Sequence, residues 1–432
     1  MPSTPRETIQ PVGDIGLHGL SLPPNAGILA FEGPDAYSMV GGLGVRVTQL
    51  ADALGAAGIR TGLYFVGAPE ALASEARSEN VRLRRWCQAI SRHHPGGVYD
   101  GEREKARDYA TSVPPAVCAE IVAPARNRGE RTLIFGEDWQ IAPAIIQLDA
   151  DLRRWGLREV VTLLWNANNT YGFETVDWKK LAAAARITAV SKYMKFELAQ
   201  RNVESLVIPN GIPADLPDAY DASAVRKLRS AISSERVLLK VGRFDPDKRW
   251  LQAIDALADM RAGGRDIVLI VRGGKEPYRS AVFERAHVRG LRVARIAAGG
   301  GTAKELLREL RGARGDVIEV TSFLPEATLY TLYGAVDAVL ANSGREPFGL
   351  VGLEVMASRG IAVCGSTGED YARPFDNALV CDTDDPRELV SYLEMLFTDS
   401  ELSERIRKSA RATAQRYTWP SVLGVLSAKL AF

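Results

Sequence analysis

Two patterns of apolar residues alternate along the chain. Short apolar runs predict buried strands, and longer stretches with an apolar residue every three or four positions predict amphipathic helices. A regular alternation of the two is typical of parallel sheets covered by helices on both faces, so the expected fold class is α/β. The strands are expected at Gly27–Phe31, Gly62–Val66, Thr132–Phe135, Val160–Leu164, Ile187–Val190, Leu206–Ile208, Arg236–Val241, Ile267–Val271, Val317–Val320, Ala338–Leu340 and Ile361–Cys364. The helices are expected at Thr48–Ala57, Ser191–Gln200, Trp250–Met260, Thr302–Arg311, Glu326–Tyr333 and Gly349–Ser358.

A break in this alternation divides the chain. The residues VIPNGIPADLP, at 207–217, concentrate Pro, Asn and Gly, which interrupt regular structure. Each side of the break holds enough strand–helix units for one doubly wound domain, so we expect domains at residues 1–210 and 211–414. The polar, arginine-rich stretch at residues 71–110 fits neither pattern and is interpreted as an insertion over the binding cleft.

Composition excludes several classes of protein. The chain has 432 residues, of which 46% are hydrophobic and 25% charged, and its formal net charge of +1 offers no general attraction to nucleic acid or membrane. No apolar run approaches the roughly 20 residues that cross a bilayer, and the amino-terminal residues lack the apolar segment of a secretory signal. The four cysteines form no CxxC pair, so we expect buried free thiols and no metal site. Without a membrane span or a secretory signal, we expect a cytoplasmic enzyme.

The glycine-rich segment GGLGVRV, residues 41–47, lies between an expected strand and an expected helix. A dinucleotide fingerprint fails here, because Val47 stands where it needs glycine, the preceding loop is long and no acidic residue ends the next strand. A nucleoside-triphosphate loop is excluded as well, since no Gly-Lys-Ser/Thr follows. What remains is a helix amino-terminus whose free N–H groups attract an anion, or whose glycines only let the loop pack closely.

The segment NSGREPFGLVGLEVMASRG, residues 342–360, carries a sharper pattern. A strand ends before it, and Pro347 precedes an expected helix. The backbone N–H groups of Gly349, Leu350 and Val351 would then bind a pyrophosphate at the helix amino-terminus. Carboxylates suit vicinal hydroxyls, so Glu346 on one side would accept hydrogen bonds from a sugar and Glu354 on the other from a ribose.

The segment KVGRFDPDKRW, residues 240–250, places two cations after another expected strand. Arg243 and Lys248 follow the carboxyl end of this strand, where parallel sheets bind their ligands. Such cations would neutralise a leaving diphosphate, which is the main electrostatic task in breaking a sugar–phosphate bond. The alternative is a solvated run of charges.

Taken together, these residues resemble the retaining GT-B glycosyltransferases, which include the group 1 family and the glycogen and starch synthases. The resemblance covers most of the chain and rests on the order and spacing of several short segments. The segments are MVGGLG at 39–44, GEDWQIAP at 136–143, PNGI at 209–212, Arg243 with Lys248, EPFGLVGLE at 346–354 with its E-x7-E spacing, and GSTGEDYARPFDNALV at 365–380.

The resemblance implies two Rossmann-like domains facing a cleft, with residues 415–432 returning to the N-terminal domain as a last helix. It implies an enzyme of carbohydrate metabolism that moves a hexose from a nucleoside-diphosphate sugar to a hydroxyl acceptor, either a saccharide or a small molecule. Such enzymes retain the anomeric configuration and use neither a metal nor a cofactor. The N-terminal domain would bind the acceptor and the C-terminal domain the donor.

The resemblance also assigns roles to residues. Many relatives carry a histidine after the strand that corresponds to Thr162–Trp165, whereas this chain has Trp165 and Asn166 there, and an asparagine cannot exchange protons near neutral pH. The implied catalytic residues are Arg243, Lys248 and Glu346; the donor-binding residues are Gly42, Gly44, Phe323, Leu324, Gly349, Leu350, Val351 and Glu354; the acceptor-binding residues are Asp138 and Asn166.

Other functions stay open. A sugar-nucleotide epimerase or a phosphorylase has the same fold, and the missing histidine motivates a non-catalytic protein that only binds a sugar nucleotide. A nicotinamide dehydrogenase is disfavoured, because the dinucleotide fingerprint fails. The donor's base and sugar, the acceptor and the oligomeric state are not predicted.

Overall fold

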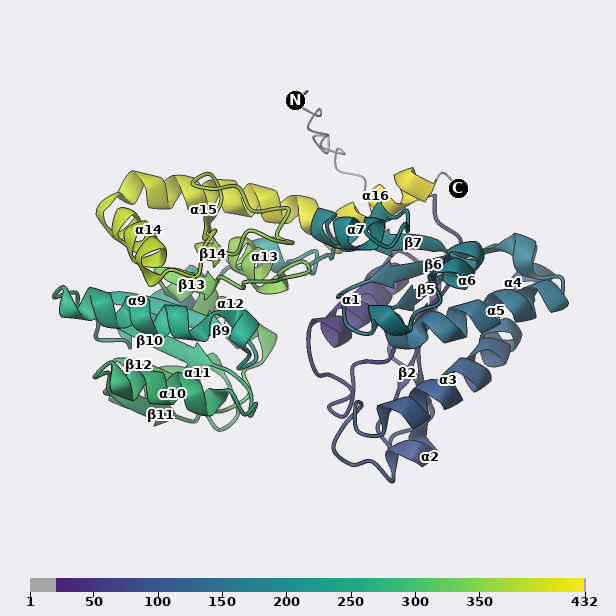
Figure 1. Cartoon of the computed structure of the whole chain (residues 1–432), viewed down its shortest axis with the longest axis horizontal. Coiled ribbons are helices and arrows are strands. Elements are labelled where there is room, and N and C mark those ends of the chain that lie inside the picture. The colour runs from purple at the N-terminus through teal and green to yellow at the C-terminus, as the bar shows by residue number, and fades with distance from the viewer. Residues whose placement is uncertain (1–20, 431–432) are drawn as a thin grey trace. The chain divides into compact units, whose positions relative to one another are not determined.

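The computed structural model describes residues 21–430 of the chain. They form two compact units (Figure 1): unit 1 holds the described residues up to Pro213 and those from Arg416, and unit 2 holds Ala214–Gln415. The amino-terminal residues, on which the expectation of no secretory signal rests, lie outside the described part of the chain. The four cysteines are buried and free, as expected.

Unit 1 is built on a sheet of eight strands in the described residues, in the order β3-β4-β2-β1-β5-β6-β7-β8. Every neighbouring pair is parallel except β3 with β4. The order reverses between β1 and β5, and the carboxyl ends of strands at such a reversal are the usual ligand edge of a doubly wound sheet. The strands are β1 Asn25–Leu29, β2 Arg60–Val66, β3 Ser74–Ala76, β4 Val81–Trp86, β5 Thr132–Glu137, β6 Val161–Ala167, β7 Arg186–Ala189 and β8 Leu206–Val207.

Helices α1 and α16 cover one face of this sheet. Val47 and Leu54 of α1 and Leu423 and Leu426 of α16 are buried in one core cluster with Leu63 of β2. The indole nitrogen of Trp419, at the start of α16, also donates to Gln49 of α1 at 3.2 Å. The helices of unit 1 are α1 Gly42–Ala56, α2 Gln88–Ser91, α3 Glu102–Val117, α4 Ala123–Asn127, α5 Ala142–Arg154, α6 Trp178–Ala184, α7 Lys192–Ala199 and α16 Trp419–Leu430, with a π-helical turn at Cys118–Val122.

The arginine-rich stretch at residues 71–110 is part of the sheet and not an insertion. Its residues Val81–Trp86 form β4, which pairs in parallel with β2, and α3 packs on α5. The alternation in VRLRRW is that of a strand, but arginines occupy the outer positions and one inner one. Arg85 is buried because its guanidinium binds the Asp35 carboxylate at 2.8 Å.

Unit 2 is built on a parallel sheet of seven strands in the described residues, in the order β11-β12-β10-β9-β13-β14-β15. Its order reverses between β9 and β13. The strands are β9 Arg236–Val241, β10 Ile267–Arg272, β11 Val293–Ile296, β12 Val317–Val320, β13 Ala338–Ala341, β14 Ala362–Cys364 and β15 Leu379–Val380. The helices are α8 Ala222–Ser230, α9 Trp250–Ala262, α10 Arg279–Val288, α11 Ala303–Gly312, α12 Glu326–Ala335, α13 Leu350–Ala357, α14 Pro386–Thr398 and α15 Ser400–Ala414.

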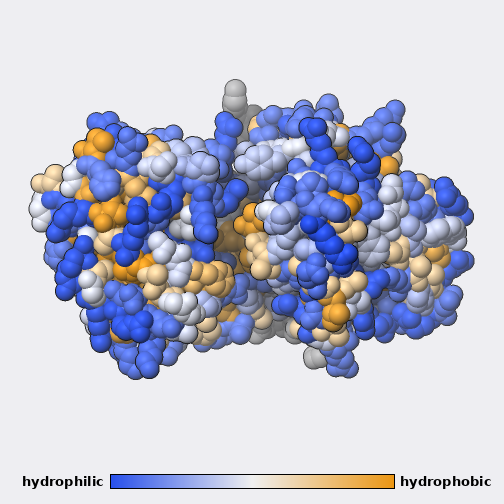
Figure 2. Space-filling view, turned by 90° about the horizontal axis from the view of Figure 1, so that it is seen from below, coloured by the Kyte–Doolittle hydropathy of each residue, from blue (hydrophilic) through white to orange (hydrophobic). Residues whose placement is uncertain are grey.

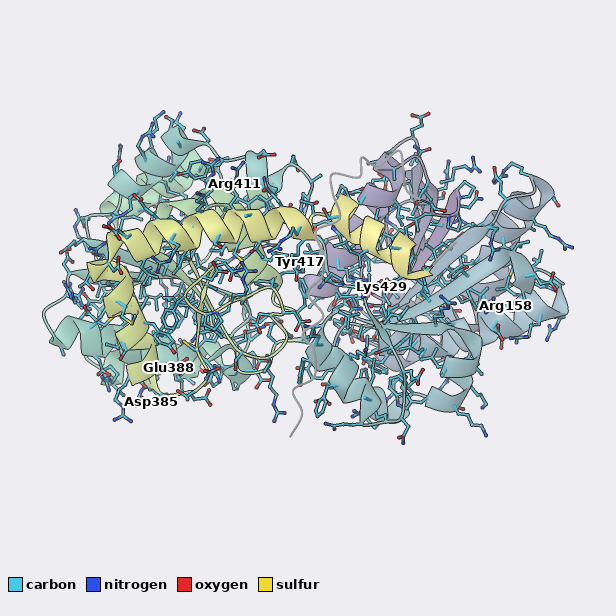
Figure 3. The ribbon with its side chains drawn as sticks, turned by 90° about the horizontal axis from the view of Figure 1, so that it is seen from above. Arg158, Asp385, Glu388, Arg411, Tyr417 and Lys429 are labelled. Carbon is cyan, nitrogen blue, oxygen red and sulfur yellow. The ribbon has the colours of Figure 1, made fainter. Side chains whose placement is uncertain are left out.

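The last two helices belong to different units (Figure 3). α15 ends at Ala414 in unit 2, and α16 belongs to unit 1, which is the return of the chain that the sequence predicts. A short parallel bridge between Ile212 and Thr418 lies beside α16.

The surface of the described residues is coloured by hydropathy in Figure 2. Hydrophilic side chains predominate over both units on the face shown in Figure 2, and apolar residues appear there in separate patches. No helix between residues 21 and 430 combines the length and apolar character needed to cross a bilayer.

Candidate functional site

The candidate site of unit 2 lies where the sheet order reverses. The loop after β9 carries Arg243 and Lys248, and the loop after β13 carries Glu346. Although far apart in sequence, Lys248 and Glu346 meet: the Nζ atom lies 2.5 Å from Oε2. The structure therefore brings together two of the three residues expected to be catalytic.

The loop that carries Glu346 is held by the segment after β14. The Thr367 hydroxyl accepts the Glu346 N–H at 2.8 Å and donates to the Glu346 carbonyl at 3.2 Å. This pair of bonds fixes the backbone of Glu346, so the position of its carboxylate depends on a segment that the sequence marks only as a small-residue loop.

Arg243 is exposed at the end of β9. Its backbone is fixed, because its carbonyl accepts the indole N–H of Trp250 at 2.8 Å and the neighbouring Phe244 ring packs on Trp250. Its guanidinium has no hydrogen bond or ion pair with any residue in the described part of the chain. A fixed backbone with an unpaired cation suits an anionic ligand.

Helix α13 begins directly after Gly349. Gly349 has φ +83°, and a Cβ atom there would lie 2.7 Å from Cγ of Glu369, so both conformation and space require glycine. The amides of Leu350 and Val351 make no hydrogen bond that the described residues supply, and no side chain caps this helix. The expected anion-binding helix end is thus present as geometry, and its role stays a prediction.

Glu354 lies within α13 in an environment that favours its neutral form. Burial raises the pKa of the Glu354 carboxyl to about 8; the nearby Glu326 adds to the rise and the Tyr333 hydroxyl opposes it. A protonated carboxyl offers one donor and one acceptor, so Glu354 can pair with a hydroxyl in either sense near neutral pH.

Phe323 and Leu324 differ in exposure. Leu324 is buried, whereas the Phe323 ring is 73% exposed with the Arg272 guanidinium 5.8 Å from its centre. Both residues follow β12 and precede α12. Their predicted contacts with the base of the donor are untested.

Sequence reasoning missed Lys240, which is fully buried behind the β9 loop. Its Nζ donates to the Leu340 carbonyl at 3.0 Å and to Oδ1 of Asn342 at 2.7 Å. The Asn342 amide in turn donates to Gln252 at 2.6 Å. Burial lowers the pKa of Lys240 to about 7, with repulsion from Lys248 in the same direction. A lysine inside the apolar run LLKVG is the signal that could have found it.

Glu369 is a second missed residue, buried beneath the amino end of α13. One carboxylate oxygen accepts the Gly365 N–H at 3.3 Å, and the other has no partner in the described residues. Burial raises the pKa of Glu369 to about 8, and the negative charge of Glu346 adds to this rise. Nothing in the sequence separates Glu369 from other acidic loop residues.

In unit 1, Arg46 and Glu137 form a buried ion pair at the carboxyl edge of the sheet. The guanidinium donates to both carboxylate oxygens, at 2.9 and 3.1 Å, and also to the side-chain oxygen of Asn210. The segments GGLGVRV, GEDWQIAP and PNGI, each singled out by sequence, thus meet at one point inside unit 1.

Asn166, an expected acceptor-binding residue, is buried with both ends of its amide in use. It donates to Glu137 at 3.1 Å and accepts the Thr188 hydroxyl at 2.8 Å. These bonds give Asn166 a structural role in unit 1. Acceptor binding by Asn166 stays a prediction, and it would need one of these bonds to be exchanged.

Asp138, the other expected acceptor-binding residue, is 2% exposed and has φ +72°. One carboxylate oxygen accepts from the Asn169 amide, and the other has no partner within residues 21–430. Burial raises the pKa of Asp138 well above its usual range. A strained, buried acid with an unused oxygen is the kind of group that ligand sites contain.

The backbone N–H groups at the start of α1 bind a side-chain carboxylate of the same unit. Oε2 of Glu32 accepts the N–H groups of Val40, Gly41 and Gly44 at 3.2, 3.1 and 3.0 Å, and Oε1 accepts the Tyr99 hydroxyl. The Gly44 amide is therefore occupied by Glu32, while Gly42 makes no such bond. That Gly42 and Gly44 touch a donor phosphate remains a prediction.

Metal chemistry has no evident site in the part of the chain that the structure describes. No group of three or more His, Cys, Asp or Glu side chains is arranged there to hold an ion.

The fold is that of the GT-B enzymes. The chain superposes on sucrose-phosphate synthase from Thermosynechococcus elongatus with a TM-score of 0.69, at 20% identity, covering 94% of this chain and 99% of that one. It also superposes on Anabaena HepE in complex with UDP-glucose with a TM-score of 0.62, at 16% identity, covering 94% of this chain and 99% of that one. The two units of this chain, each built on a largely parallel sheet, are the two Rossmann-like domains that the sequence resemblance implies.

Residues 225–413, all within unit 2, match the family described as glycosyl transferases group 1. This match covers most of unit 2, which spans Ala214–Gln415. A putative glycosyltransferase of Bacillus subtilis, YtcC, is 26% identical over 239 residues, which are 52% of this chain and 54% of that protein. The matched part spans about half the length of such curated relatives.

Proposed function

We propose that the protein is a retaining glycosyltransferase that moves a hexose from a nucleoside-diphosphate sugar to a hydroxyl acceptor. The observation that carries this proposal is the contact between Lys248 and Glu346 in the loop that leads into the uncapped amino end of α13. The match to the group 1 family and the likeness to a protein crystallised with UDP-glucose support a sugar nucleotide as donor.

In this proposal the diphosphate lies at the amino end of α13. The amides of Leu350 and Val351 donate to it, and Arg243 and Lys248 neutralise the charge that grows on it as the sugar–phosphate bond breaks. Lys248 is bound to Glu346, so the donor's phosphate would share that cation with the carboxylate. These cations take the place that a metal has in other transferases, and we propose that neither a metal nor a cofactor is needed.

The transfer itself exchanges one bond for another on the same face of the sugar. The bond from the anomeric carbon to the phosphate oxygen breaks, the acceptor oxygen bonds to that carbon, and the acceptor's proton passes to the leaving phosphate. Glu346 would hold sugar hydroxyls and Glu354 ribose hydroxyls. Unit 1 would supply the acceptor side, where Asp138 has a free carboxylate oxygen.

The test is a screen of UDP-, ADP-, GDP- and TDP-sugars by thermal shift, followed by transfer assays with the stabilising donor. A ligand that binds only the folded protein raises its melting temperature by mass action. We expect one donor class to stabilise the protein, transfer to survive EDTA, and the product to keep the donor's anomeric configuration. Inversion, or complete loss of transfer with EDTA that added metal restores, would contradict the proposal.

A second candidate is a protein that binds a sugar nucleotide without turning it over. The observation that favours it is Asn166, which stands at the expected histidine position and is bound on both sides by Glu137 and Thr188. Calorimetric binding of the donor with neither transfer nor hydrolysis, over a panel of saccharide acceptors, would select this alternative. Conversion of the donor with no acceptor present would instead indicate an epimerase.

A further inference from the structure

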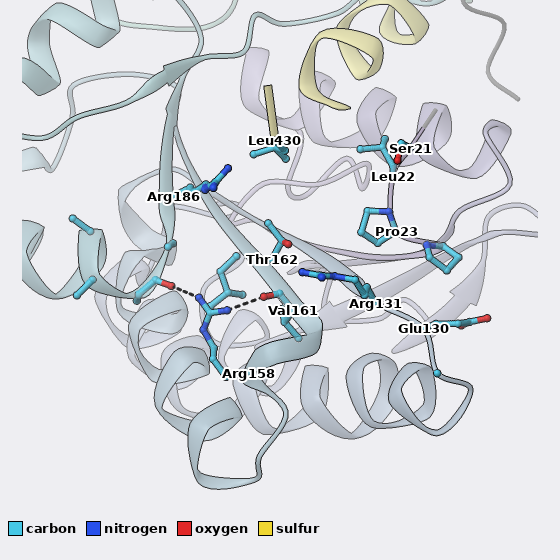
Figure 4. Close-up of a pocket in the computed structure, with 17 residues that line it drawn as sticks. Ser21, Leu22, Pro23, Glu130, Arg131, Arg158, Val161, Thr162, Arg186 and Leu430 are labelled. Carbon is cyan, nitrogen blue, oxygen red and sulfur yellow. Dashed lines mark hydrogen bonds between the residues drawn. The ribbon is translucent and has the colours of Figure 1, made fainter. Parts of the chain in front are cut away.

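Unit 1 has a pocket of about 800 Å³ at the edge of its sheet where strands β5, β6 and β7 begin (Figure 4). It is lined by residues at the amino ends of β5, β6 and β7, by the end of α6, and by Leu22 and Leu430. Its volume falls in the range of small-molecule sites. None of the residues assigned to the transferase reaction lines it.

The strand register places three polar side chains on one face of the sheet in this pocket. Leu133 pairs with Thr162, and Leu164 pairs with Arg186, so the members of each pair point to the same face. Because side chains alternate along a strand, Arg131 shares the face of Leu133, and Thr162 shares that of Leu164. In the view of Figure 4, Thr162 lies between Arg131 and Arg186.

Both outer arginines carry charge that no neighbour neutralises. Arg131 and Arg186 are exposed and make no ion pair or side-chain hydrogen bond with any residue in the described part of the chain. Glu130, the acidic residue of the pocket lining, is already bound by Arg60, Arg128 and Asn25. Most other arginines of unit 1 are paired, as Arg77 is with Asp52.

The third arginine of the lining, Arg158, forms a fixed wall. It donates to the carbonyls of Val161 and Ala184 at 2.7 and 3.0 Å, and it binds Asp149 at 2.5 Å. The pocket therefore has a rigid side, two free cations and a hydroxyl donor. Five-donor guanidinium groups that converge with a hydroxyl suit a compact oxyanion such as a phosphate group.

We propose that this pocket binds a small phosphorylated molecule through Arg131, Thr162 and Arg186. The chain's formal net charge is only +1, which favours a small anion over a nucleic acid or a membrane surface as the ligand. The site is separate from the proposed transfer reaction and does not depend on it.

Calorimetric titration of the full chain with inorganic pyrophosphate tests this site. The titration is run on a background that carries both Arg243→Ala and Lys248→Ala, which removes the two cations of the proposed donor site. We expect one binding event that the added change Arg131→Gln with Arg186→Gln weakens at least about tenfold, because two charge-assisted contacts are lost. Arg107→Gln changes an exposed arginine of α3 that does not line the pocket; it is the matched control and should leave binding unchanged.

A second measurement separates the pocket from any loss of folding. The variant Arg131→Gln with Arg186→Gln is also made in a protein that keeps Arg243 and Lys248. Its transfer rate without added phosphate should equal that of the unchanged protein. Inorganic phosphate should compete with pyrophosphate, and both should bind more weakly at higher salt. Equal pyrophosphate binding by the double variant and its parent, or no binding by either, would overturn the proposal.

Discussion

Lys248 and Glu346, 98 residues apart in the chain, form an ion pair whose atoms lie 2.5 Å apart in unit 2. The pair is partly exposed, so its own contribution to stability is small, about 1 kcal/mol at most. Its value is positional: it holds a cation and a carboxylate at the amino end of α13. Substitutions here should therefore change the reaction more than the fold.

Lys248→Ala should lower kcat/KM by about two or more orders of magnitude, because a cation facing the leaving diphosphate is lost. Glu346→Gln should also lower it, and the double variant should lose less than the two single losses combined, since the residues contact each other. Steady-state kinetics with the identified donor measure this coupling. Lys408→Ala, an exposed lysine of α15, is the control. Strict additivity would show that the two residues act separately.

Gly349→Ala should destabilise the protein by about 2 kcal/mol or more. The residue has φ +83° and a Cβ atom would lie 2.7 Å from Glu369 and 3.0 Å from the Tyr371 hydroxyl. Gly290→Ala separates the cost of the positive φ from the cost of crowding, because Gly290 has φ +73° but open space around it. This substitution should cost only about 1 kcal/mol. Urea unfolding measures both. Equal losses would mean that the crowding at Gly349 is relieved by movement.

Glu354 should make the protein less stable as pH rises. Its folded pKa of about 8 lies above the ordinary value of 4.5 for a glutamate, so the folded state binds the proton more tightly than the unfolded state. The free energy of unfolding that this group contributes is full below pH 4.5 and is lost as pH rises toward 8. Glu354→Gln should therefore flatten the decline between pH 5 and pH 8 by an amount on the order of 1 kcal/mol. Glu284→Gln, an exposed glutamate of α10, should leave the decline unchanged.

Lys240 should act in the opposite direction at higher pH. Its folded pKa of about 7 lies below the ordinary value of 10.5 for a lysine, so between these two pH values the unfolded state binds more protons. The free energy of unfolding should rise with pH over this window, and Lys240→Met should abolish that rise. Chemical unfolding at pH 7, 8 and 9 measures it. A parallel rise in the variant would assign the effect to another group.

Arg46→Met should cost about 3–5 kcal/mol, because it leaves the buried Glu137 carboxylate without its cation. The comparable change at a surface pair, Arg153→Met beside Asp149, should cost at most about 1 kcal/mol. Thermal and urea unfolding of both variants give the comparison. A small loss for Arg46→Met would mean that Glu137 becomes protonated or hydrated at little cost.

Strand positions were the most predictable part of the fold. β9 and β12 have the limits that their apolar runs indicate, because a central parallel strand is buried on both faces and leaves a continuous apolar signal. Helix α1 begins at Gly42, six positions before the expected Thr48, since its first turn is rich in glycine. That turn is held by Glu32, whose carboxylate accepts the Gly44 N–H, and such a contact has no local signature.

Only the part of the candidate site that lies on one continuous segment could be predicted from the sequence. Glu346, Gly349 and Glu354 lie on one loop and helix, so their relation follows from helical geometry. The partners Lys240 and Glu369 come from other strands, and only the folded sheet brings them beneath the same loops. Strand β4 was missed for a related reason: its arginines suggest solvent, but Arg85 is neutralised by Asp35 from another loop.

The bridge between Ile212 and Thr418 has a consequence for how the two units are joined. Ile212 exchanges backbone hydrogen bonds of 2.9 Å with Tyr417 and Trp419, so the chain leaves unit 1 and re-enters it at adjacent positions. Unit 2 is consequently one uninterrupted stretch, Ala214–Gln415, with its two connections side by side. Unit 2 is thus arranged as a domain inserted into unit 1. A gene fragment for this stretch encodes a whole domain, and a linker of a few residues would rejoin the two parts of unit 1 if unit 2 were removed.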